Sequence, residues 1–111
     1  MLASLIIQPS IVDKIKEEQA NDADLQKVRV EVIKGEKPEF NLAGDETLRF
    51  GTRLCVPNLE EIKKEILVEA HCTHYSVHPG STKMYRNVSK TFWWAGMKRD
   101  IAKFVEQCLI S

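Results

Sequence analysis

Two histidines and one cysteine in the C-terminal part of the chain have side chains that bind metal ions. Six residues separate His71 from His78, and Cys108 follows after another twenty-nine. Imidazole nitrogen and thiolate sulfur are the ligands that zinc prefers, so these residues predict a zinc clip that closes a small three-helix unit. A four-ligand site of this spacing would require a cysteine where the chain has Ser111, and a serine hydroxyl is a poor zinc ligand at neutral pH.

Cys72 and His74 are alternative ligands beside the first histidine. His71 and His74 stand three residues apart at the end of a predicted helix, where they could chelate a metal by themselves. That arrangement leaves the turn at His78 and Pro79 without a role, so we rank it second. Histidine and cysteine are also common as core residues, which is the structural alternative to any metal site.

Positive charge is concentrated in the same part of the chain as the predicted ligands. Residues 1–70 contain 10 Lys and Arg against 14 Asp and Glu, whereas residues 71–111 contain 6 against 2, so the net charges are −4 and +4. Such a cationic surface could contact the phosphates of nucleic acid. The six candidate residues are Lys83, Arg86, Lys90, Lys98, Arg99 and Lys103. The alternative is that they form the solvated faces of two amphipathic helices.

The composition is that of an ordinary globular protein. A chain of 111 residues is long enough for one compact domain, or for two subdomains that share an interface. It has no run of about 18 apolar residues that could span a membrane, and residues 1–7 lack the features of a signal peptide. Three cysteines without framework spacing favour a reducing compartment. Among these three, Cys55 is expected to be a packing residue, because it lies in a predicted strand.

The residues before position 58 predict two helices and a hairpin. Apolar residues at helical spacing indicate helices over about residues 11–19 and 25–34. The polar stretch 36–44 is expected to be a loop. Apolar and polar residues then alternate on both sides of Gly51, which predicts a β-hairpin over residues 47–57.

The residues from position 58 onward predict three helices. The first ends at His71, the second is capped by Ser81 or Thr82, and the third extends from Met97 to Cys108. A Phe-Trp-Trp run precedes the third helix, and so much aromatic surface in three residues must be core or interface.

The predicted fold class is therefore mostly α with a small β-hairpin. We expect an α-helical N-terminal extension over residues 1–57, which ends with the hairpin, and a compact three-helix domain of zinc-binding type over residues 58–111. An isolated hairpin is marginally stable in water, so this hairpin must pack on neighbouring helices.

Two motifs of this second part carry a resemblance to a known family. The segments Tyr-Ser-Val-His-Pro-Gly, residues 75–80, and Phe-Trp-Trp followed by Gly-Met-Lys-Arg-Asp-Ile, residues 92–101, are highly specific. From about residue 5 to its end the chain resembles the N-terminal region of the integrase of gypsy-type LTR retrotransposons, in the form found in plants. That region is a zinc-binding His-His-Cys-Cys domain after a small extension domain, and it precedes the DDE nuclease core.

The resemblance implies that His71, His78 and Cys108 are three zinc ligands, and that Ser111 stands in place of the fourth, a cysteine. Ala95 is a second departure, since the family has proline there. The implied protein is an integrase module without enzymatic activity, because the DDE core is absent from these residues. It would bind DNA and assemble multimers during DNA integration, in the nucleus or also in the cytoplasm.

A second hypothesis comes from a different class of function. The chain would be a domesticated, free-standing protein derived from a transposable element, and it would act as a protein-interaction adaptor for a host partner. Neither hypothesis involves a membrane. The departure at Ser111 and the near-zero net charge are the sequence features that favour the second.

Overall fold

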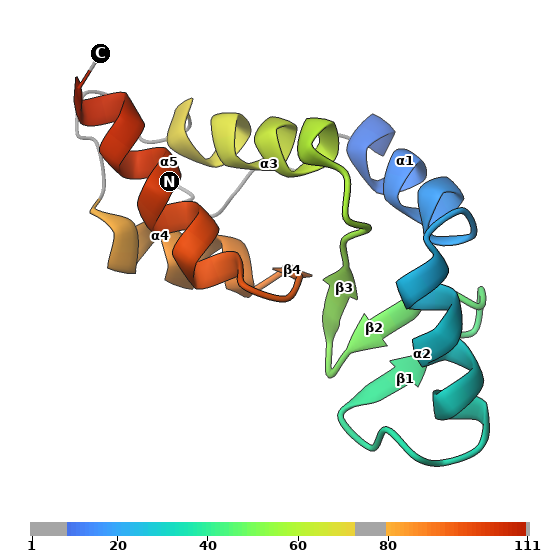
Figure 1. Cartoon of the computed structure of the whole chain (residues 1–111). Helices are drawn as coiled ribbons and strands as arrows, with labels where there is room; N and C mark the ends of the chain where they lie inside the picture. Colours follow the sequence, from blue (N-terminus) through green and yellow to red (C-terminus); the bar gives the residue numbers. More distant parts are fainter. Residues whose placement is uncertain (1–8, 73–79, 111) are drawn as a thin grey trace.

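The computed structural model describes the backbone of residues 9–72 and 80–110, and the side chains of residues 11–71 and 80–107. These residues form five helices and one four-stranded sheet (Figure 1). The predicted fold class, mostly α with a small β element, is confirmed. The β element is larger than the predicted hairpin, and none of the described helices is long and apolar enough to cross a membrane.

The two predicted N-terminal helices are α1 (Pro9–Gln19) and α2 (Ala23–Ile33). Asp22 caps α2, because its side-chain Oδ1 accepts a hydrogen bond of 3.1 Å from the backbone N–H of Leu25. The helix ends in a Schellman motif. The N–H of Gly35 donates to the carbonyl of Val32, and the N–H of Glu36 donates to the carbonyl of Glu31. Gly35 has a φ of +79°, a conformation that glycine adopts without strain.

The sheet contains the predicted hairpin and two strands that the sequence did not predict. Its strands lie in the order β1-β2-β3-β4, with the bounds Phe40–Leu42, Leu48–Phe50, Arg53–Cys55 and Phe92–Trp93. The hairpin is β2 and β3, which pair antiparallel around Gly51 at a φ of +64°. The expected loop over residues 36–44 is wrong in part, because β1 lies within it and pairs with β2.

The last strand joins the two parts of the chain. β4 comes directly from the aromatic run and pairs parallel with β3. The backbone N–H groups of Leu54 and Val56 donate to the carbonyls of Thr91 and Trp93, at 2.7 and 2.8 Å. The hairpin therefore pairs with a strand from the C-terminal part of the chain. This pairing provides the additional contacts that an isolated hairpin lacks.

The predicted three-helix unit consists of α3 (Glu60–Cys72), α4 (Ser81–Ser89) and α5 (Met97–Ile110). α4 packs on both α3 and α5. The residue at the capping position of α4 is Gly80 rather than Ser81 or Thr82, and it makes no side-chain cap bond. Figure 1 shows that these helices lie at one end of the molecule, whereas α2 and β1 lie at the other.

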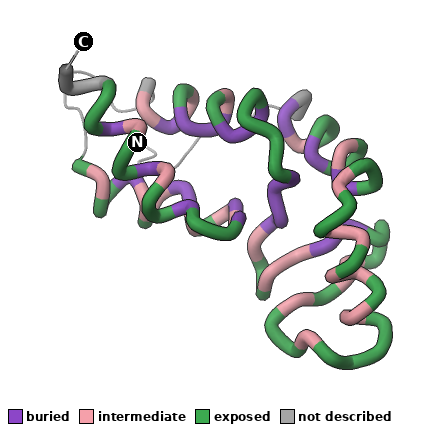
Figure 2. Tube along the Cα trace, in the orientation of Figure 1, coloured by how far each residue is buried: buried purple, intermediate pink, exposed green. Residues whose placement is uncertain are grey.

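One hydrophobic core runs through both halves of the described chain (Figure 2). Its fully buried side chains include Ile15 of α1, Ile66 of α3 and Ile101 of α5, all at most 1% exposed. Phe92 and Trp94 are buried in the same cluster, and Trp93 packs against it. The predicted boundary between residues 57 and 58 stays a prediction.

A buried glutamine joins the end of α1 to the sheet. Gln19 donates from its side-chain nitrogen to the carbonyls of Leu48, at 3.0 Å, and Cys55, at 2.7 Å. Its side-chain oxygen accepts from the N–H of Leu48 at 2.9 Å. The β2–β3 register pairs Arg49 with Leu54, so Leu48 and Cys55 are the next residues along the two strands. The glutamine amide supplies hydrogen bonds to both of them.

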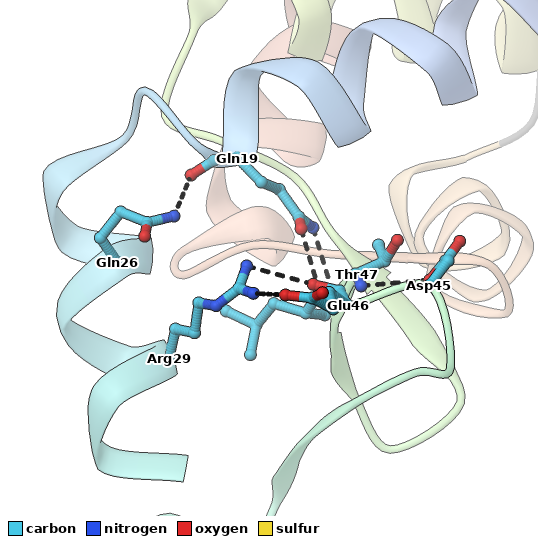
Figure 3. A network of polar contacts seen from close by, with 7 residues as sticks. Gln19, Gln26, Arg29, Asp45, Glu46 and Thr47 are labelled. Atoms are coloured by element: carbon cyan, nitrogen blue, oxygen red, sulfur yellow. Dashed lines mark hydrogen bonds and ion pairs between the residues drawn. The ribbon is translucent and has the colours of Figure 1, made fainter. Parts of the chain in front are cut away.

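Two further polar contacts hold the turn between β1 and β2 (Figure 3). Arg29 of α2 donates to the backbone carbonyl of Glu46 and also binds its carboxylate. Hydrogen bonds from Thr47, and then the nearby Lys16 ammonium, hold the pKa of the Asp45 carboxyl well below its usual range. The turn is thus tied to both N-terminal helices.

Candidate metal centre and basic surface

His71 is the predicted zinc ligand whose side chain the structure describes. It lies in the last turn of α3 and is half-buried. Its imidazole ring meets the ring of Phe104 of α5 edge to face, with centroids 5.9 Å apart. The predicted ligand Cys108 follows Phe104 by four residues in the same helix. α3 therefore places His71 against α5 one helical turn before Cys108.

Three helix ends of the described chain lie at the same end of the molecule as His71. α3 ends, α4 begins and α5 ends on the same side of the helical unit in Figure 1. His78 precedes Gly80, the capping residue of α4, by two positions. His78 and Ser111 lie outside the described residues, as does the alternative ligand His74; the side chains of Cys72 and Cys108 lie outside the description too.

The described residues alone form no metal site. Among them, no three His, Cys, Asp or Glu side chains are grouped closely enough to hold an ion. What the structure provides is the position of His71 and the course of α5 toward Cys108. The predicted donor atoms, imidazole nitrogen and thiolate sulfur, are those that zinc prefers, so the residues are chemically suited to a zinc site.

Cys55 is excluded as a ligand or nucleophile in the folded chain. Its side chain is completely buried in β3, and burial raises the pKa of its thiol to about 12. Metal binding requires the thiolate, which this environment disfavours. The prediction that Cys55 is a packing residue is therefore confirmed.

All six predicted basic residues are exposed, but they do not share one surface. Lys83 and Arg86 are exposed on α4, and Lys90 is the exposed residue that caps its C-terminal end. Lys98 of α5 lies beside α4, where its ammonium is 5.9 Å from the centroid of the Tyr85 ring. Lys103 follows five residues later and is therefore turned about 140° around the helix, toward α3.

Lys103 lines a groove between α3 and α5 that has a volume of about 330 Å³. Leu67 and Phe104 contribute apolar surface, and Lys64 adds a second ammonium. Neither Lys64 nor Lys103 forms an ion pair with another described residue. Lys64 is not among the predicted basic residues because it belongs to the acidic half of the chain. Its position seven residues before His71 on α3, two helical turns away, was the available signal.

Two of the three other charged residues of this groove, Asp100 and Lys63, are already engaged. Asp100 accepts a hydrogen bond of 2.9 Å from the indole nitrogen of Trp94. Lys63 donates to the side chain of Asn58 at 2.7 Å and lies 5.9 Å from the Trp94 ring centroid. Trp94 thus contacts Asp100 in the first turn of α5 and Lys63 near the start of α3. These contacts hold the two helices that form the groove.

A comparison with known proteins finds a family match over these three helices. The curated proteins and the solved structures give no significant match to the chain. The family model described as the integrase zinc binding domain matches residues 59–110. This stretch contains all of α3, α4 and α5, and with them His71, His78 and Cys108. The match supports an integrase zinc-binding region over this part of the chain.

Proposed function

We propose that the chain is an integrase-derived module in which zinc joins the end of α3 to the end of α5. The observation that supports this most directly is the contact between His71 and Phe104. Side chains four residues apart on a helix are about 5–6 Å apart, so Cys108 is the neighbour of Phe104 on the same face. This spacing supports the pairing of His71 with Cys108 as ligands from α3 and α5.

His78 would be the third ligand. It enters from the segment that leads into α4, so the metal would connect all three helices of the unit. The chemistry that zinc supplies when bound is structural, since it cross-links side chains of distant segments and stabilises the folded state. Ser111 stands where the integrase pattern has a cysteine, and this substitution is expected to weaken zinc affinity.

The module would also bind duplex DNA and self-associate, as the resemblance to gypsy-type retrotransposon integrases implies. The exposed Lys83 and Arg86 of α4, together with Lys90 at its C-cap, support the DNA contact. Lys98 extends it at the junction of α4 and α5. Lysine and arginine at these positions would contact phosphate groups and would not read base sequence. The nucleus is the compartment in which such a module would act.

The test of the proposal is metal content together with thermal stability. We expect the purified chain to bind one zinc ion, and a chelator to lower its melting temperature. His71→Ala and Cys108→Ser should abolish zinc binding, because each removes a ligand. Ser111→Cys should raise the melting temperature further, and only when zinc is present.

The matched control is Cys72→Ser, which makes the same chemical change beside His71. It should leave zinc binding unchanged. Loss of zinc in Cys72→Ser with retention in Cys108→Ser would reject the proposed ligand set in favour of the alternative ligands at the end of α3. A chain that binds no zinc at all, and whose melting ignores the chelator, would reject the metal site itself.

A further inference from the structure

A second hollow lies far from the predicted ligands, between α2 and the sheet. Its volume is about 280 Å³. Its apolar lining includes Leu25 and Val28 of α2, Phe40 of β1, and Trp93 of β4 with the adjacent Trp94, besides the buried Val56 and the exposed Ala95. Of these, Leu25, Val28, Phe40 and Trp93 are only half-buried. The described chain therefore leaves this aromatic and aliphatic surface partly uncovered.

The helix above the hollow is unusual because it buries none of its residues. α2 contains five aliphatic side chains, yet no residue of its 11 is buried. Val30 and Ile33 on the outer side are 50% and 69% exposed. An amphipathic surface helix normally buries its apolar stripe. Since Leu25 and Val28 face the hollow without filling it, a partner could complete their burial.

The rim of the hollow is acidic. Asp22 and Asp24, at the start of α2, line this hollow and also an adjoining one of about 250 Å³ that includes Glu18. Asp22 already accepts from the backbone N–H groups of Leu25 and Asn58. A carboxylate can accept more than two hydrogen bonds, so Asp22 keeps some capacity.

The Asp24 carboxylate is exposed and forms no hydrogen bond or ion pair with any side chain of the described ranges. The one cation of the hollow is Lys63, which is 8% exposed and held by Asn58. The lining of the hollow therefore contains two carboxylates and one ammonium, so its net charge is negative. The adjoining hollow has no basic residue in its lining. The local field favours a cationic ligand.

We propose that this α2–sheet hollow binds a short basic segment of a partner protein. The segment inserts one large apolar side chain against Phe40 and Trp93 and places a Lys or Arg beside Asp24. The volume fits one or two side chains and is too small for a whole helix. Aromatic rings next to a carboxylate also suit the stem and the charged head of Lys or Arg.

The experiment uses three acetylated eight-residue peptides that share Gly-Ser flanks and differ only in their centres, Lys-Leu-Lys, Glu-Leu-Glu and Lys-Ser-Lys. Binding is followed by the fluorescence of Trp93 and Trp94, the two tryptophans of the chain. We expect the Lys-Leu-Lys peptide to bind with at least a fivefold lower Kd than the other two. Added salt should weaken its binding, because the charge contact is exposed. Equal binding of all three peptides, or no fluorescence change with any, would overturn the proposal.

Two variants locate the site. Asp24→Asn should raise the Kd of the Lys-Leu-Lys peptide about two- to fivefold, the range of an exposed ion pair. Asp13→Asn is the control, because Asp13 is an exposed residue of α1 outside both hollows and loses the same charge. Val28→Lys, which places a cation inside the hollow, should abolish binding without loss of helix content. Equal effects of the two Asp→Asn variants would place the peptide elsewhere and reject the site.

Sedimentation of the chain without peptide tests another occupant, a second copy of this chain. We expect Val28→Lys to leave the oligomeric state unchanged. An assembly of the unmodified chain that this substitution dissolves would show that a second copy covers α2, and would overturn the proposal of a separate partner.

Discussion

Gln19 is the side chain on which the junction of α1 with the sheet depends most. Its amide satisfies two backbone carbonyls and one backbone N–H inside the core. Gln19→Ala would leave all three groups buried without partners, and each such group costs about 1–3 kcal/mol. We expect the free energy of unfolding in urea to fall by about 2–4 kcal/mol, allowing for partial relaxation.

The control for this prediction is Gln26→Ala. Gln26 is only half-buried and donates a single bond of 2.9 Å, to the backbone carbonyl of Gln19. Its loss should cost about 1 kcal/mol or less. Similar losses in the two variants would mean that water or a shifted backbone replaces the Gln19 amide.

No feature of the sequence singled out Gln19. A glutamine at the end of a short helix is usually exposed, and its role depends on strands that begin 29 positions later in the chain. Cys55 was a different case, because the alternation of apolar residues in its strand predicted burial. His71 was predicted as a ligand from residue type and spacing alone, and its contact with Phe104 came only from the structure.

The thiol of Cys55 should be protected by the fold. Burial raises its pKa to about 12, so the folded state holds the proton that an unfolded thiol releases near pH 8.5. This contribution to stability is fully present below about pH 8.5 and is lost as the pH rises toward the folded pKa. We expect iodoacetamide at pH 8 to modify Cys55 in urea and not in the folded chain, as measured by mass spectrometry of the Cys55 peptide. Rapid modification of the folded chain would contradict the packing role.

At the scale of secondary structure, the strength of the local signal decided what could be predicted. Asp22 and Gly35 mark the two ends of α2, and Gly51 marks the hairpin, so these elements followed from periodicity and turn chemistry. β1 and β4 have only 3 and 2 residues. β4 is too short to show alternation, and the Phe-Asn-Leu alternation of β1 lies within a polar stretch without a turn signal like Gly51. Both strands form because a neighbouring strand offers hydrogen bonds.

The end of α2 offers a direct test of one such signal. Gly35→Ala should lower the free energy of unfolding by about 1 kcal/mol, because a side chain is strained at a φ of +79°. Gly44→Ala is the matched control. A side chain at either position would meet no atom within 4 Å, and only Gly35 has a positive φ. Equal effects of the two substitutions in urea unfolding would show that the Schellman motif does not require glycine.

At the scale of the whole molecule, charge is distributed along the long axis. The acidic half contains α1, α2 and nearly all of α3, and the basic half contains α4 and α5. α2 lies at one end of the molecule, and α3 lies with α4 and α5 at the other. The sequence predicted this separation from residue counts. It did not predict that α5 would turn Lys98 and Lys103 toward different neighbours, because that depends on how the three helices pack.

This polarity predicts where the proposed DNA contact lies. Lys83→Gln should weaken binding to a short duplex and lower the slope of log K against log salt by about 0.9, the value for one phosphate contact. Lys27→Gln removes an exposed lysine from α2 and should change neither quantity. Fluorescence anisotropy at several salt concentrations measures both. An equal effect of the two substitutions would assign the binding to net charge rather than to the α4 surface.

The parallel pairing of β3 with β4 also affects how the chain is made. During synthesis, α1, α2 and the first three strands are translated before Phe92 and Trp93. Until then the backbone groups of Leu54 and Val56 lack the partners that they have in the finished protein. The sheet edge at β3 is therefore completed only after β4 has been made. A nascent chain that paused between the two strands would expose this open edge to chaperones.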